Sequence, residues 1–105
     1  MKLADVVIAM LESGRYKQIA GRLHGIGNER CIVGILCDAC DIVYGPYDSS
    51  PYVDCEDTPR GREFKAVYNA LSDGSSHGNK GFSIECENDE GVTFQEFANR
   101  LRSQA

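Results

Sequence analysis

Residues 31–40, with the sequence CIVGILCDAC, are the most apolar run of the chain and constrain its fold most. Such a run is typical of a buried element, and its spacing alone does not separate a strand from a helix. On a helix one face would be apolar, made by Ile32, Ile35, Leu36, Ala39 and Val43. Asp38 and Asp41 would point away from that face. We therefore predict a buried helix of about three turns here.

A chain of 105 residues has room for one domain, residues 1–105, packed around this run. No window approaches the ~20 apolar residues of a membrane span. The first residues carry Asp5 and Glu12 and lack a signal-peptide cleavage pattern. We expect no membrane contact and a cytoplasmic location, where cysteines are thiols by default.

Three further helices are predicted from apolar spacing and capping signals. The first ends at Gly14 and has the stripe Leu3, Val6, Val7, Met10 and Leu11. The second begins with Thr58 as N-cap before Pro59, ends at Gly74, and buries Phe64, Val67, Tyr68 and Leu71. The third follows a Thr93–Glu96 capping box and buries Phe94, Phe97, Ala98 and Leu101.

Two segments indicate minor β structure. Residues 16–30 are glycine-rich and predict an irregular or hairpin connection that turns at residues 24–28. Phe82, Ile84 and Cys86 alternate with polar residues, which predicts a short strand. The fold class expected is α+β: a small, helix-rich single domain of about four helices with a minor β-hairpin or short strands.

Acidic residues gather in two segments of this small acidic protein, whose formal net charge is −5. Residues 36–58 hold six Asp and Glu and no Lys or Arg, and residues 81–99 hold five acids and no base. This distribution argues against direct nucleic-acid binding, which needs a basic surface. Most such acids cap helices and solvate loops. If the two segments fold together, however, they form a negative face that could attract a cation, a basic protein or a DNA-binding site.

Cys37 and Cys40 have the C-x-x-C spacing of a zinc or redox pair. A structural zinc site needs four ligands, and the remaining candidates are single residues: Cys31, Cys55, Cys86, His24 and His77. A redox pair should follow a strand, whereas this pair ends an apolar run. Buried structural thiols are the favoured interpretation, and a zinc site of Cys37, Cys40, Cys55 and Cys86 is the alternative.

Signals for catalysis are weak. His24 and His77 both lie in glycine-rich turns, and nothing nearby pairs either with a nucleophile. Residues 74–81 fail the phosphate-loop pattern because Asn79 precedes Lys80 and Gly81 follows it. We therefore predict no catalytic residue, no cofactor and no enzymatic activity.

Residues 11–18 (LESGRYKQ), 31–38 (CIVGILCD) and 88–98 (NDEGVTFQEFA) occur in an order and at spacings that carry a resemblance. They resemble a family of small uncharacterised proteins encoded by tailed bacteriophages and prophages. Ile32 stands where the family has a second cysteine, and the residues before Asn88 suggest a strand where family members look helical. The resemblance implies a phage or prophage origin and the host cytoplasm, and it implies no mechanism.

The segment 44–57 combines tyrosine, proline and acid, a composition common on binding surfaces. We predict that it contacts a host or phage protein through Tyr44, Tyr47, Tyr52, Asp54, Glu56 and Asp57. The function expected is therefore a non-enzymatic accessory protein that binds a protein partner. The alternatives are the small zinc-binding protein and an acidic DNA mimic that inhibits a host nuclease. The sequence leaves the oligomeric state open.

Overall fold

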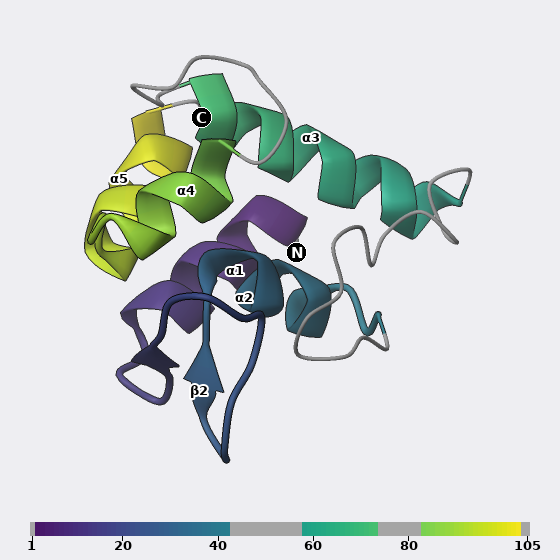
Figure 1. The fold of residues 1–105 in the computed structure, drawn as a ribbon. Coiled ribbons are helices and arrows are strands. Elements are labelled where there is room, and N and C mark those ends of the chain that lie inside the picture. The colour runs from purple at the N-terminus through teal and green to yellow at the C-terminus, as the bar shows by residue number, and fades with distance from the viewer. Residues whose placement is uncertain (1, 43–57, 74–82, 104–105) are drawn as a thin grey trace.

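The computed structural model describes residues 2–42, 58–73 and 83–103, which contain five helices and a parallel pair of short strands. In chain order the elements are α1 (Leu3–Glu12), β1 (Lys17–Gln18), β2 (Glu29–Arg30), α2 (Ile32–Ala39), α3 (Pro59–Asp73), α4 (Ser83–Asp89) and α5 (Phe94–Ser103). The helices pack around one another, and the segment that joins α1 to α2 projects at one edge (Figure 1). This arrangement confirms the predicted small, helix-rich α+β class.

α1 and α5 pack along each other and form the most extensive helix contact in the described part of the chain. Their buried side chains are Leu3, Val7 and Leu11 on α1 and Phe94, Phe97, Ala98 and Leu101 on α5. Full burial of one Leu or Phe side chain contributes roughly 1.5–3 kcal/mol. Segments from opposite ends of the sequence therefore share one core. Val6 and Met10 were predicted in the same stripe but are only half-buried.

α2 lies at the centre of the fold and confirms the predicted buried helix. Every residue from Ile32 to Cys37 is buried. The helix is shorter than predicted because Asp41 adopts a left-handed conformation with φ 58°. The Ile42 amide then donates to the Cys37 carbonyl oxygen at 2.9 Å, a bond that closes the helix end. Val43 lies outside the described residues.

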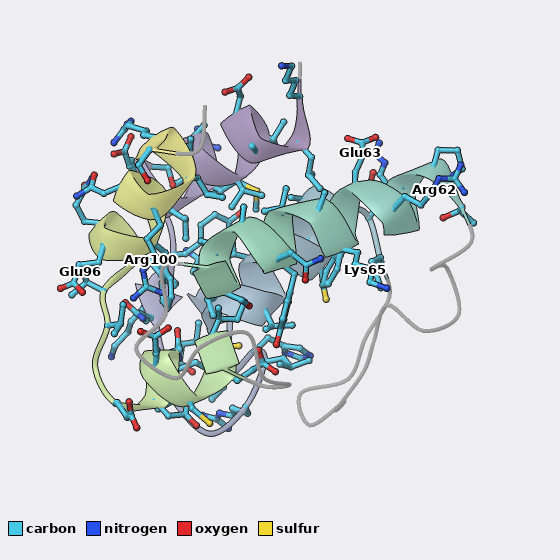
Figure 2. The ribbon with its side chains drawn as sticks, turned by 90° about the horizontal axis from the view of Figure 1, so that it is seen from above. Arg62, Glu63, Lys65, Glu96 and Arg100 are labelled. Carbon is cyan, nitrogen blue, oxygen red and sulfur yellow. The ribbon has the colours of Figure 1, made fainter. Side chains whose placement is uncertain are left out.

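The predicted caps of α3 and α5 are confirmed. Thr58 Oγ1 accepts a hydrogen bond from the Gly61 amide at 3.0 Å, and Thr93 Oγ1 accepts one from the Glu96 amide at 3.2 Å. Each hydroxyl satisfies a backbone donor that has no partner inside its helix. The N-terminal half of α3 carries exposed charged side chains directed away from the molecule, labelled Arg62, Glu63 and Lys65 in Figure 2.

The predicted strand around residues 82–86 is wrong, since α4 occupies Ser83–Asp89. Ile84, Glu87 and Asn88 are buried at helical spacing, and Cys86 is exposed. The alternation of apolar and polar residues predicted a strand because Glu87 and Asn88 were expected to face solvent. In α4 both side chains are buried and hydrogen-bonded.

The connection from α1 to α2 contains the short β structure. Lys17 pairs with Glu29 and Gln18 with Arg30 in parallel register, and an antiparallel bridge joins His24 to Arg30. The predicted turn at residues 24–28 is present, because the Gly25 amide donates to the Glu29 carbonyl oxygen at 3.0 Å. The strand pairing itself is parallel and is not that of a hairpin.

Candidate binding surface

A buried amide network centred on Asn88 joins three distant segments. Asn88 is 4% exposed, and its Oδ1 accepts hydrogen bonds from the Ile32 amide at 3.0 Å and from Gln18 Nε2 at 2.9 Å. Its Nδ2 donates to the Ile19 carbonyl oxygen at 2.7 Å. The side chain therefore satisfies groups on the β1 segment and at the start of α2. Buried amides of this kind are costly unless fully bonded.

Gln18 completes the network from the other side. Its Nε2 also donates to the Val92 carbonyl oxygen at 2.6 Å, and its Oε1 accepts from the Phe94 amide at 3.0 Å, at the start of α5. Gln18, Ile32 and Asn88 belong to three segments that are distant in sequence, residues 11–18, 31–38 and 88–98. These segments therefore meet in the structure through the hydrogen bonds of Gln18 and Asn88.

Glu87 of α4 and Arg100 of α5 form a buried bidentate ion pair, with oxygen–nitrogen distances of 2.8 and 2.7 Å. The Glu87 side chain is 3% exposed and that of Arg100 is 18% exposed. Arg100 Nη1 also donates to the Leu71 carbonyl oxygen of α3 at 3.4 Å. Arg100 lies between α5 and α4, whereas Glu96 of the same helix points outward (Figure 2). The pair connects three helices and is not presented to solvent.

Two more ion pairs hold elements together at the surface. Arg102 Nη2 donates to Glu12 across the α1–α5 contact, and this hydrogen bond lowers the pKa of the Glu12 carboxyl. Arg30 Nε donates to Asp38 Oδ2 at 2.6 Å, and the same guanidinium lies 5.9 Å from the centre of the Tyr16 ring. Both arginines therefore serve the packing of neighbouring elements.

The cysteines of the described residues are distributed unevenly. Cys31, Cys37 and Cys40 are buried, and Cys86 is exposed. Burial raises the pKa of the Cys31 thiol, which disfavours the nucleophilic thiolate. Among residues 2–42, 58–73 and 83–103, no three His, Cys, Asp or Glu side chains lie close enough to hold a metal ion. Cys55 and His77 lie outside these ranges, so the zinc alternative stays a prediction.

The half-buried titratable groups next to the core are in local contacts. His24 Nδ1 lies 3.4 Å from the Gly25 carbonyl oxygen. The hydroxyl group of Tyr68 in α3 donates a hydrogen bond to Glu85 Oε1 of α4 at 2.7 Å. Burial raises the pKa of the Glu85 carboxyl, so the buried position favours its protonated form. The Tyr68–Glu85 hydrogen bond therefore joins α3 to α4.

The outer face of α1 is hollowed, with a volume of about 420 Å³. Its lining is Val6, Ala9, Met10, Ser13, Arg15 and Tyr16. We call this hollow the α1 groove. It is open to solvent and mostly apolar along α1, and Arg15 is the one charged residue of its lining. Surfaces of this kind, with apolar contacts and a few polar groups, are typical of binding sites.

The α1 groove was not predicted from the sequence. Met10 packs against the core as predicted and also lines the groove, whereas Val6 lines the groove beside the face that Leu3, Val7 and Leu11 turn to the core. A helix that is apolar on more than one face needs a second partner. The apolar residues of α1 outside a single stripe were therefore the sequence signal for a second contact surface. The predicted partner-binding residues, Tyr44, Tyr47, Tyr52, Asp54, Glu56 and Asp57, lie outside the described residues.

No family model, no curated protein and no solved structure matches this chain. No helix among the described residues is both long and apolar enough to cross a membrane.

Proposed function

We propose that this chain is a non-enzymatic accessory protein that acts by binding another protein. The observation that carries the proposal is the α1 groove, where Val6 and the part of Met10 that does not pack against the core remain accessible to a partner. Binding of a partner over such apolar side chains is favourable because it removes their surface from water.

The polar side chains of the interior support the same proposal. Asn88, Gln18, Glu87 and Arg100 are in bonds that hold helices or strands in place. Within the described residues, no buried side-chain polar atom lacks a hydrogen-bond partner. Active sites usually keep some polar groups poised toward a substrate, whereas these groups face one another.

The origin and the second contact surface rest on the sequence. The resemblance of residues 11–18, 31–38 and 88–98 supports a phage or prophage protein acting in the host cytoplasm. The acidic tyrosine- and proline-rich segment 44–57 supports a further contact with the same partner. The proposed function does not depend on which of the two surfaces makes the stronger contact.

The proposal is tested by cross-linking in living bacteria that express the tagged full chain, followed by affinity purification and quantitative mass spectrometry. Three proteins are compared with wild type: Ala9→Arg, which fills the α1 groove; the triple change Tyr44→Ser, Tyr47→Ser and Tyr52→Ser; and Asn69→Arg as a control. Ala9 and Asn69 are both exposed helical positions, so the two arginine variants are matched.

We expect one protein to be enriched with wild type and with Asn69→Arg, and to fall at least fivefold with one of the other two variants. Equal recovery with all four proteins would contradict binding through either surface. Stoichiometric zinc in the purified chain, lost on Cys37→Ser, would favour the zinc-binding alternative. Competition with DNA for a nuclease, lost when Asp54, Glu56 and Asp57 are neutralised, would favour the DNA mimic.

A further inference from the structure

The position of Arg15 makes the α1 groove chemically selective. Arg15 is exposed, lines the groove, and forms no ion pair with the described residues. Within residues 2–42 and 83–103 every other arginine pairs with a carboxylate: Arg22, Arg30, Arg100 and Arg102. A planar guanidinium offers parallel donors that match a carboxylate. Arg15 is therefore available to an acidic group from outside the described chain.

The surroundings of the groove strengthen this charge preference. None of its lining residues is acidic. Lys2 precedes Val6 by four residues and places a second cation near the opposite end of the same helix face. Glu12, one turn before Tyr16, is turned toward α5, where it bonds to Arg102 and Gln95. Asp5 is the one remaining acid of α1, and it lies on the flank, outside the lining.

Groove-to-groove pairing of two copies of this chain is disfavoured for the same reason. Two copies related by a twofold axis would place the same surface on both sides of the contact. Antiparallel packing of the two α1 grooves would then bring Lys2 of one copy toward Arg15 of the other. The facing cations would repel, and neither lining holds a carboxylate to compensate.

Resting on the proposed function, we infer that the α1 groove binds an acidic segment of the partner protein, with an apolar side chain inserted between Val6, Met10 and Tyr16. A carboxylate of the same segment pairs with Arg15. An apolar residue and an acid one or two helical turns apart would reach both features, as in recognition of an amphipathic helix by a groove. The groove volume of about 420 Å³ fits a few side chains and not a folded domain.

The test is selection of random peptides displayed against the purified full chain, followed by binding measurements on synthetic copies of the enriched peptides. We expect enriched sequences to combine Leu, Phe or Met with an excess of Asp and Glu. Arg15→Glu and Ala9→Arg should each weaken binding at least tenfold, and Arg60→Glu, which alters an exposed arginine of α3, should not. A peptide with its acids changed to lysine should bind Arg15→Glu better than wild type.

The inference is overturned if no peptide is enriched, if the enriched peptides are neutral or basic, or if Arg15→Glu binds them as tightly as wild type. Sedimentation of wild type as a dimer that Ala9→Arg dissociates would assign the groove to a second copy instead. If the cross-linked cellular partner survives both groove variants and is lost with the tyrosine variant, the inference fails while the proposed protein-binding function stands.

Discussion

The Oδ1 atom of Asn88 lies 3.0 Å from the backbone nitrogen of Ile32, so a side chain at the end of α4 caps the start of α2. Cys31, the residue at the N-cap position of α2, makes no side-chain cap bond of its own. The first amides of a helix have no partner within it, and most helices satisfy one from a nearby Ser, Thr, Asp or Asn. Here the partner comes from 56 residues away along the sequence.

Asn88→Ala should therefore destabilise the protein well beyond the loss of one cap. The substitution leaves the Ile32 amide and the Ile19 carbonyl oxygen without their Asn88 partners in a buried position. Each such group costs about 1–3 kcal/mol, so we expect a loss of about 2–6 kcal/mol in the free energy of unfolding. Denaturant titration measures it. Asn28→Ala is the matched control, because Asn28 is exposed, and a loss equal to the control would refute the capping role.

Arg100→Met should cost about 3–5 kcal/mol, because it leaves the Glu87 carboxylate buried without its cation. The double variant Glu87→Met, Arg100→Met should recover part of that loss, since it removes the uncompensated charge. Arg102→Met serves as control, because its partner Glu12 is at the surface, and it should cost clearly less than Arg100→Met. Additive single effects in the double-mutant cycle would show that the two side chains are not coupled.

Gly34→Ala should destabilise the protein even though alanine favours helix by about 1 kcal/mol. A Cβ atom at position 34 would lie 2.1 Å from the Leu23 carbonyl oxygen, which is backbone and cannot rotate away. Leu23 is held there because its oxygen accepts the Cys31 amide at 3.0 Å. We expect a net loss of about 1–3 kcal/mol by thermal or chemical unfolding. Asn69→Ala, an exposed helical position, should not destabilise, and an unchanged Gly34→Ala variant would refute the close approach.

Glu85→Gln should stabilise the protein at neutral pH and have little effect near pH 4. Burial raises the pKa of Glu85, so the folded state binds its proton more tightly than the unfolded state does. The contribution of Glu85 to stability is thus greatest at low pH and declines as pH rises through the pKa of the folded state. The amide cannot ionise and avoids that decline. Unfolding curves at pH 4 and pH 7.5, with exposed Glu96→Gln as control, should show a difference that grows with pH, and a constant difference would contradict the role of burial.

The helices at the two ends of the described chain and α3 were predictable because their signals are local. Thr58 and Thr93 each cap a helix within three residues, and the apolar spacing of α5 gave its four buried residues. Such patterns need no knowledge of the rest of the fold.

α4 was not predictable in the same way, because its buried face includes Glu87 and Asn88. Their burial is favourable only because Arg100, Gln18 and Ile32 lie beside them, and a single sequence does not show those contacts. The α1 groove escaped prediction for a related reason. Val6 looks like a core residue until the tertiary packing of Leu3, Val7 and Leu11 shows which face of α1 is covered.

The packing of α1 against α5 has a consequence for synthesis of the chain. α5 follows α1 by some ninety residues, so the part of the apolar face of α1 that α5 covers stays exposed until α5 has left the ribosome. The part that packs against α2 needs only a neighbouring segment of the chain. The core around α1 should therefore be completed only when α5 is available, and the Gln18–Asn88 bond, which spans 70 residues, would be made in a similarly late step.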